Sequence, residues 1–309
     1  MATVTPDSRL LLLAGPTAVS KSAVALLLAE RLNGEIVSVD SMQVYRGLDI
    51  GTDKPAAADR TRITHHLIDV AGITESFDAA KFAALAKQAV AEIQSRGRTP
   101  ILCGGTGLYF RAFLEGLGDA PAADAALRTE LERLPLEELL RELQLRDPAT
   151  YERIDRQNPR RVVRAVEIIR LTGKPVSTQR AEWFKSPASP TPHFYCLNRT
   201  VDDLRARIDR RVEEMFRRGL VEETRRLLET GLGENKTAMQ ALGYRQVVEH
   251  LHGERSLSET IELVKTRTRQ FAKRQLTWFR KQPGLQWVEV APDETPEKIA
   301  ERLGVGSGV

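Results

Sequence analysis

The sequence predicts an α/β fold in which a parallel sheet is flanked by helices and interrupted by an all-helical insertion. Over residues 10–105, short apolar runs alternate with helical segments, and turns containing glycine close several of the runs. Residues 119–192 are instead charged, helical in pattern and punctuated by prolines. Strand–helix–strand alternation is typical of parallel strands joined by right-handed crossovers. We therefore expect residues 1–118 and 193–309 to form the core, and residues 119–192 to form the insertion.

The expected elements follow in order along the chain. Apolar and β-branched runs predict strands at residues 10–14, 35–39, 67–70 and 99–103, and the segments between them predict helices at 21–32 and 77–93. Residues 194–197 are expected to return the chain to the sheet. Later helices are expected to start at Thr200 and Ser256, each with an acidic residue three positions on, and at Thr295, which precedes a proline.

Composition excludes several classes of protein. The 309 residues are 41% hydrophobic and 28% charged, which is ordinary for a folded chain. No apolar run approaches the roughly 18 residues of a membrane span, and residues 10–14 are too short for a secretory signal. Cys103 and Cys196 are the two cysteines, too few for a disulfide framework or a four-ligand zinc site. We expect a cytoplasmic protein without a membrane partner, and a frayed tail at residues 304–309.

Basic residues are concentrated in two stretches, although the net charge is only +4. Residues 265–281 contain seven basic and no acidic side chains, and residues 156–170 contain five arginines against one glutamate. Runs of one sign on helices favour a polyanionic partner, whereas a merely solvated helical face, which is the alternative, usually carries interspersed acidic residues. The charge pattern therefore favours a nucleic acid as partner.

A glycine-bounded loop between the first expected strand and helix points to phosphate binding. Backbone N–H groups of such a loop, with the positive end of the following helix, bind anionic oxygens. In such a loop Lys21 would neutralise phosphate charge, and the hydroxyl of Ser22 would be placed to ligate Mg²⁺, so Ser22 is the expected metal ligand. The residues expected to hold the phosphates are Gly15, Pro16, Thr17, Ala18, Val19, Ser20, Lys21 and Ser22. The loop makes the predicted core P-loop NTPase-like, and a chance loop is the alternative.

Ser20 departs from the strict phosphate-loop pattern, which has glycine at this position. If the backbone there needs a positive φ, a serine costs about 1–2 kcal/mol. We therefore expect weaker phosphate binding than a perfect loop allows, and we expect Ser20→Gly to improve it.

Three further features are expected at the same edge of the sheet. Asp40 follows the second strand, and ligands of parallel sheets lie beyond the carboxyl ends of the strands. Its carboxylate could hold Mg²⁺ or accept a proton, or it could simply cap a helix. The Gly-Gly-Thr-Gly run at 104–107 follows the fourth strand and allows a close approach of backbone. Arg211 falls on the apolar stripe of its helix, where its charge needs either a bound pyrophosphate or a structural carboxylate.

Taken together, these motifs resemble the bacterial tRNA dimethylallyltransferases, also called tRNA isopentenyltransferases. The resemblance spans nearly the whole chain in order and is carried by residues 15–22, 38–55, 104–109, 243–246 and 266–278. It implies transfer of a dimethylallyl group from dimethylallyl diphosphate to the exocyclic amine of the adenosine 3′-adjacent to the tRNA anticodon, with release of pyrophosphate. Asp40 would then be the general base. The groups that would hold the diphosphate and its Mg²⁺ are Thr17, Lys21, Ser22 and Arg211.

The resemblance also implies which residues contact the anticodon stem-loop of the tRNA. Thr106 would lie in the reaction channel near the target nucleotide. The other contacts would be Asp40, Ser41, Met42, Gln43, Arg128, Arg160, Arg161, Arg164, Gln240, Gly243, Tyr244, Arg245, Lys273, Arg274, Gln275, Trp278 and Arg280. Several of these fall in the two basic stretches already recognised from the charge pattern.

Two other functions stay open on the sequence. A P-loop nucleotide or small-molecule kinase would share the phosphate loop, but it would bind ATP and would not need the basic C-terminal helices. A non-catalytic RNA-binding protein with a decayed phosphate loop would bind tRNA without turnover. For the transferase we expect a monomer that uses Mg²⁺.

Overall fold

The computed structural model describes residues 10–117, 121–179 and 193–303. The chain divides into two compact units, Met1–Leu114 with Ser189–Val309, and Glu115–Ala188. No helix within the described ranges is both long and apolar enough to cross a membrane. The tail at 304–309, for which we expect fraying, lies outside the described residues.

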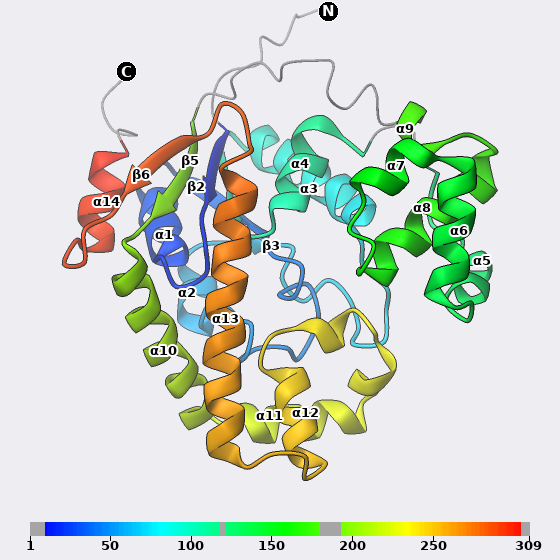
Figure 1. Cartoon of the computed structure of the whole chain (residues 1–309). Coiled ribbons are helices and arrows are strands. Elements are labelled where there is room, and N and C mark those ends of the chain that lie inside the picture. Colours follow the sequence, from blue (N-terminus) through cyan, green and yellow to red (C-terminus); the bar gives the residue numbers. More distant parts are fainter. Residues whose placement is uncertain (1–9, 118–120, 180–192, 304–309) are drawn as a thin grey trace, which may run out of the picture. The chain divides into compact units, whose positions relative to one another are not determined.

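A six-stranded parallel sheet organises the first unit, with the strand order β3-β2-β4-β1-β5-β6 (Figure 1). The strands are β1 (Leu11–Ala14), β2 (Gly34–Val39), β3 (His65–His66), β4 (Thr99–Gly104), β5 (Phe194–Asn198) and β6 (Gln286–Glu289). All pairings between these strands are parallel. The predicted α/β class, a parallel sheet flanked by helices, is confirmed.

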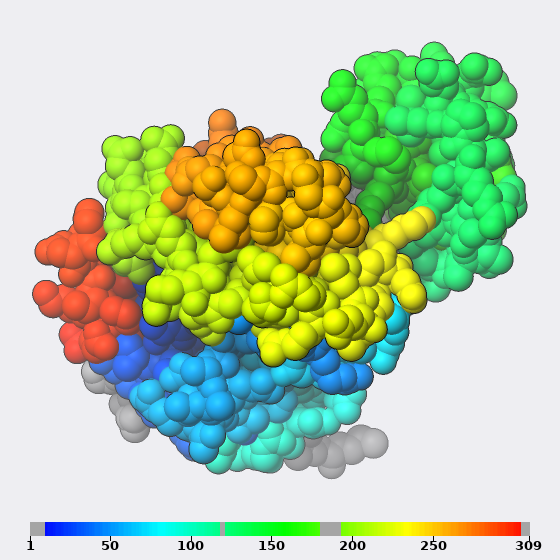
Figure 2. All heavy atoms as spheres, turned by 90° about the horizontal axis from the view of Figure 1, so that it is seen from below, coloured from blue at the N-terminus to red at the C-terminus, as the bar shows by residue number. Residues whose placement is uncertain are grey.

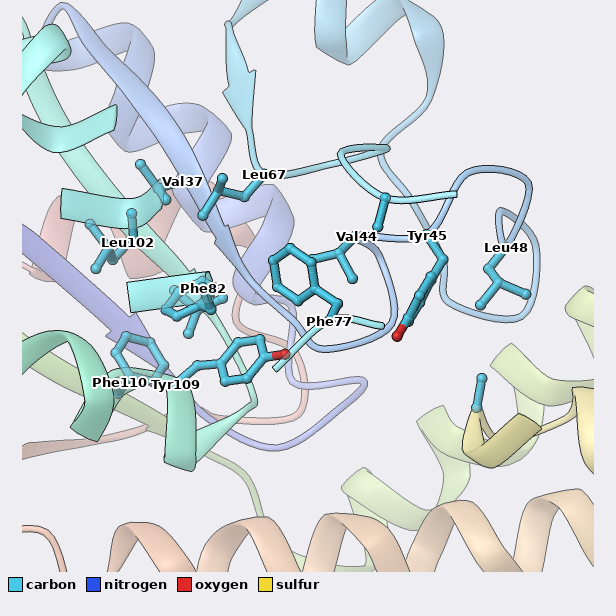
Figure 3. Packing of buried hydrophobic residues seen from close by; sticks show 14 of the residues in the cluster. Val37, Val44, Tyr45, Leu48, Leu67, Phe77, Phe82, Leu102, Tyr109 and Phe110 are labelled. Atoms are coloured by element: carbon cyan, nitrogen blue, oxygen red, sulfur yellow. The ribbon is translucent and has the colours of Figure 1, made fainter. Parts of the chain in front are cut away.

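Helices cover both faces of this sheet, as the alternation of buried side chains requires. In β1, Leu12 belongs to the hydrophobic cluster on one face and Leu13 to the cluster on the other. On the first face Phe82 stacks on Tyr109 with 4.2 Å between ring centroids (Figure 3). That face is covered by α3 (Ala79–Ser95) and α4 (Gly107–Glu115), and the other by α1 (Lys21–Arg31) and α14 (Pro296–Arg302). Burial on both faces explains why β1, in the interior of the sheet, is a continuous apolar run.

The structure corrects the strand predictions at two places. The third strand is His65–His66 and not 67–70, because Leu67 and Asp69 adopt positive φ angles of 62° and 59° and leave the extended region. No apolar run marks β6, since it is an exposed edge strand that pairs with β5 alone among the described strands. The helix expected from residue 77 begins at Ala79, where the Asp78 side chain caps it.

Four helices of the C-terminal part pack together in the first unit, and their yellow-green to orange atoms form one continuous surface in Figure 2. Ile208 of α10 (Val201–Arg217) and Val264 of α13 (Leu257–Phe279) meet in a small apolar cluster of their own. The helix starts predicted at Thr200, Ser256 and Thr295 are confirmed, since each side chain accepts a hydrogen bond from the backbone N–H three residues on. The helices are α10 (Val201–Arg217), α11 (Leu220–Glu229), α12 (Tyr244–Leu251) and α13 (Leu257–Phe279), and the short elements are α2 (Ala57–Arg62) and 3₁₀ turns at Leu232–Glu234 and Ala238–Gln240.

The second unit is helical and has its own core, in which Leu143 and Val166 are fully buried. Glu167 is also buried, and its carboxylate accepts hydrogen bonds from Arg128 and Arg164 at 2.6 and 2.7 Å. Its helices are α5 (Ala125–Leu131), α6 (Leu136–Arg146), α7 (Pro148–Arg153), α8 (Pro159–Thr172) and α9 (Val176–Gln179).

Candidate active site

The phosphate loop joins β1 to α1 and is held in a left-handed backbone conformation. Ala18 and Ser20 have φ angles of 65° and 81°, so the position occupied by Ser20 does require the positive φ that glycine adopts without strain. The ammonium group of Lys21 folds back and donates to the carbonyl oxygen of Pro16 at 2.6 Å. The loop therefore presents its backbone and the N-terminus of α1 to the carboxyl edge of the sheet.

Asp40 follows β2 at this same edge and is fixed by a turn. Its Oδ1 accepts hydrogen bonds from the backbone N–H groups of Met42 at 2.8 Å and Gln43 at 3.3 Å. The hydroxyl of Thr106 accepts from the N–H of Ser41 at 3.1 Å, which ties this turn to the loop after β4. Among the described residues, Asp40 accepts hydrogen bonds through Oδ1 alone. No α-helix starts directly after Asp40, so its side chain holds a turn and does not cap a helix.

One cavity of about 390 Å³ brings these segments together. The residues that the resemblance predicts to be catalytic all line it, with Asp40 as the general base and Thr17 and Arg211 as groups that hold the diphosphate. Polar residues of the phosphate loop and of the turn at Asp40 line the cavity. Apolar side chains of α10 and α13 line it as well, namely Val212, Met215, Val264 and Phe271. The cavity can thus hold an anionic group at the loop together with a hydrophobic group beside it.

Gln275 of α13 joins two loops that line the cavity, the phosphate loop and the loop after β4. Its Oε1 accepts from the N–H of Thr17 at 2.9 Å, and its Nε2 donates to the carbonyl oxygen of Gly105 at 3.0 Å. The glycines of the Gly-Gly-Thr-Gly run at 104–107 allow close approaches on two sides. A Cβ on Gly105 would lie 2.2 Å from the Gln275 amide nitrogen and one on Gly107 would lie 2.2 Å from the Trp278 ring, so both approach α13, whereas a Cβ on Gly104 would lie 2.0 Å from the Val39 carbonyl oxygen of β2.

Arg211 has both a ligand-facing position and a carboxylate partner. Its guanidinium lies 3.5 Å from the carboxylate of Asp53, whose side chain is 45% exposed and also lies 3.8 Å from Arg218. A half-exposed pair of this kind contributes little to stability, so Arg211 can exchange Asp53 for a bound anion at small cost. Of the two alternatives that the sequence left open for Arg211, the structure shows the carboxylate partner, and binding of a pyrophosphate stays a prediction.

Lys21 is the most strongly perturbed cation of the site. Burial lowers the pKa of Lys21 to about 8, and the nearby positive charge of Arg211 acts in the same direction. An anion beside Lys21 would raise this pKa again and favour the charged ammonium group, which suits a residue at an anion-binding site.

The comparisons with known proteins agree with this geometry. Residues 43–282 match a family model described as IPP transferase, which is more than half of the chain. The chain belongs to the IPP transferase family. The resemblance inferred from the sequence motifs is thereby confirmed.

Relatives of this family match along nearly the full chain. A tRNA dimethylallyltransferase 1 of Trichlorobacter lovleyi is 48% identical over 91% of this chain and 93% of its own length. The structure of a tRNA isopentenylpyrophosphate transferase from Bacillus halodurans is similar, with a TM-score of 0.70 and 39% identity over 96% of this chain and 95% of that one. A eukaryotic dimethylallyltransferase acting on tRNA gives a TM-score of 0.77 at 28% identity, over 92% of this chain and 74% of that one.

Several residues that the resemblance assigns to tRNA have structural partners. Tyr244 is fully buried, and its hydroxyl donates to Glu223 at 2.6 Å and accepts from the N–H of Gly51 at 3.1 Å, so its side chain does not reach the surface. Gln275 is 7% exposed and holds the two loops. In the second unit, Arg128 and Arg164 neutralise Glu167 as described above.

Other predicted contacts are accessible. In the first unit, Gln240 and Arg274 are exposed and line the cavity. Exposed side chains elsewhere are Arg160, Arg161, Arg245, Lys273 and Arg280, and Trp278 is half-buried against the cluster behind Gly107. Within the basic stretch of α13, Lys265 pairs with Glu213 and Arg269 pairs with Asp209. These two side chains are therefore already neutralised by carboxylates of α10.

Neither the apolar side chains of the cavity nor the pairing of Asp53 with Arg211 is evident from the sequence. The stripe of α10 that includes Val212 and Met215 has ordinary helical spacing, which predicts core packing equally well. Asp53 adopts φ 54°, and nothing in its local sequence places it beside Arg211, which is far away along the chain.

Proposed function

We propose that this chain transfers a dimethylallyl group from dimethylallyl diphosphate to the exocyclic amine of the adenosine 3′-adjacent to a tRNA anticodon, and releases pyrophosphate. The observation that carries the proposal is the single cavity that unites Thr17, Lys21 and Ser22 of the phosphate loop with the Asp40 carboxylate. Membership of the IPP transferase family and the names of its relatives support the same reaction.

The leaving group dominates the chemistry. The amine of adenine is a poor nucleophile because its lone pair is delocalised into the ring, so the barrier falls mainly by stabilising the departing pyrophosphate. Lys21, Arg211 and the N–H groups at the start of α1 are fixed positive groups at that place. Preorganised donors of this kind act strongly in a site that excludes water, and exclusion of water also protects an allylic centre from hydrolysis.

Asp40 would take the proton that the amine loses as the new C–N bond forms. Its Oδ1 accepts hydrogen bonds from backbone N–H groups, Asp40 lines the cavity, and Oδ2 would be the proton acceptor. For this reaction the base must leave the stack of the anticodon loop and enter the cavity. Thr106, whose hydroxyl holds the turn at Ser41, lies at the same wall and would contact the entering nucleotide.

A magnesium ion fits this donor set only together with the substrate. Among the described residues no group of three or more His, Cys, Asp or Glu side chains could hold a metal ion by itself. Magnesium is commonly held by one or two protein oxygens plus substrate phosphates, and the Ser22 hydroxyl lines the cavity where the diphosphate would sit. When bound, Mg²⁺ would neutralise charge on the diphosphate.

We further propose that tRNA is held by exposed basic residues of both units, among them Arg160, Arg161, Lys273, Arg274 and Arg280, and that the enzyme acts as a cytoplasmic monomer. Phosphate contacts of this type supply affinity that depends on salt. No feature of the site favours the kinase alternative over the transferase.

Incubation of the protein with tRNA and labelled dimethylallyl diphosphate, and in parallel with labelled ATP, tests the proposal. We expect label on tRNA, located by nuclease digestion in the adenosine that follows the anticodon, and no transfer from ATP. Transfer from ATP to a small acceptor would indicate a kinase, and tRNA binding without label transfer would indicate a non-catalytic RNA-binding protein.

A further inference from the structure

The phosphate loop carries two strained residues and needs an external support. Ala18 and Ser20 both adopt the left-handed backbone conformation, at φ 65° and 81°, and neither is glycine. A residue other than glycine in this conformation is strained and persists only when its surroundings hold it there. The loop must therefore be held by contacts outside its own sequence.

Arg207 of α10 contacts both strained residues. Its Nε donates to the carbonyl oxygen of Ala18 at 2.9 Å, and its Nη2 donates to the hydroxyl of Ser20 at 2.6 Å. Two bonds from one planar guanidinium fix the direction of the loop as well as its distance from α10. The hydroxyl that receives the second bond exists because this chain has serine at the position where the strict phosphate-loop pattern has glycine.

The helix that carries Arg207 is itself firmly placed. Ile208 packs in the α10–α13 cluster, Ala18 packs against the same cluster, and Arg269 of α13 pairs with Asp209 at 2.5 Å. Among the described residues no ion pair joins Arg207 to a carboxylate, so its charge is directed at the loop. Arg211, one helical turn further on, lines the cavity. One face of α10 thus carries a group for the loop and a group for the ligand.

We propose that Arg207 is a positioning residue that holds the phosphate loop in its binding conformation through Ala18 and Ser20, and that its bond to the Ser20 hydroxyl compensates for serine at this position. The inference rests on the proposed function in so far as the ligand of the loop is a diphosphate. It also changes the expectation for Ser20→Gly, because relief of backbone strain is offset by loss of the bond from Arg207.

Binding of inorganic pyrophosphate with Mg²⁺, measured by calorimetry, tests the proposal without tRNA or prenyl transfer. The variants are Ser20→Ala, which removes the hydroxyl and leaves a side chain at the same φ, Arg207→Gln, and the double variant. Arg205→Gln is the matched control, since it removes the same charge from an exposed position of α10. Arg205 lines neither the cavity described above nor a second cavity beside the phosphate loop, which Ser20 and Arg207 line.

We expect Arg207→Gln to weaken pyrophosphate binding about tenfold to a hundredfold, as loss of two charged hydrogen bonds implies. In the Ser20→Ala background the same substitution should cost at least about threefold less, because one of its two bonds is already gone. Arg205→Gln should stay within about twofold of the parent chain. Arg207→Lys keeps the charge without the planar fork and should remain weaker than the parent.

Equal losses in both Ser20 backgrounds would overturn the role of Ser20, and an unchanged affinity in Arg207→Gln would overturn the proposal as a whole. Full restoration by Arg207→Lys, or an equal loss in Arg205→Gln, would show that charge and not positioning is responsible. A general loss of folding is separated by tRNA affinity, which Arg207→Gln should leave unchanged. If pyrophosphate binding shows the expected coupling while no label reaches tRNA, the proposed function fails and the positioning role stands.

Discussion

Replacement of Gln275 by leucine removes a side chain that joins the phosphate loop to the loop after β4. Leucine is similar in size but cannot bond to the N–H of Thr17 or to the carbonyl oxygen of Gly105. Leaving a buried polar group unpaired costs about 1–3 kcal/mol. The bond to Gly105 is buried and the bond to Thr17 is partly buried, so we expect the free energy of unfolding to fall by about 2–4 kcal/mol.

Urea denaturation measures this loss, and calorimetry with pyrophosphate measures the accompanying loss of affinity. Gln270→Leu is the matched control, because Gln270 is exposed on the same helix, and it should change stability by less than about 0.5 kcal/mol. Gln275→Glu keeps an acceptor for Thr17 but sets a carboxylate against the Gly105 carbonyl, and it should also destabilise. If Gln275→Leu matched the control in both stability and pyrophosphate affinity, the reasoning about the loops would be refuted.

Three further predictions concern single features of the first unit. Burial lowers the pKa of Lys21 to about 8, so pyrophosphate affinity should fall as the pH rises above about 8. The free energy of unfolding should rise over the same range, up to the unfolded pKa of 10.5, because the unfolded chain then binds a proton that the folded chain has lost. Calorimetry and urea titrations across this range check both, and an affinity independent of pH would contradict the prediction. Replacing Lys273 and Arg274 by glutamine should weaken tRNA binding and reduce the slope of log affinity against log salt by about one for each basic side chain that had neutralised a phosphate, whereas an unchanged slope would exclude phosphate binding by these residues. Tyr244→Phe should lower the free energy of unfolding, measured by urea denaturation, by about 1–3 kcal/mol, because buried Glu223 loses a hydrogen-bond donor, and tRNA affinity should stay unchanged. Unchanged stability with weaker tRNA binding would instead indicate that Tyr244 contacts the RNA.

The class of fold and the edge of the sheet that holds the site were predictable because both depend on local patterns. Apolar runs closed by glycine mark strands buried on both faces, and the loop at 15–22 must lie at a helix N-terminus whatever surrounds it. Even the positive φ of Ser20 could be anticipated from the pattern. The third strand was misplaced because nothing in the residues signals the left-handed backbone at Leu67 and Asp69.

Contacts between distant segments could not be predicted from these patterns. Gln275 is a polar residue in a basic helix and would be expected at the surface, yet the fold brings it to Thr17 and Gly105. Tyr244 lies in a motif shared with the family, and a motif does not distinguish a residue that touches substrate from one that supports the site. Arg207 is one of several arginines on its helix, and only its bonds to the loop separate it from its neighbours.

The most direct test of the central claim, that Asp40 and the phosphate loop serve one reaction in one cavity, is single-turnover prenyl transfer by Asp40→Asn. Asparagine keeps an oxygen for the N–H groups of Met42 and Gln43, so the turn should survive while the base is lost. With saturating dimethylallyl diphosphate and tRNA, we predict a rate lower by about a hundredfold to ten-thousandfold, with both dissociation constants within about threefold of the parent chain. A rate equal to that of the parent would contradict the account.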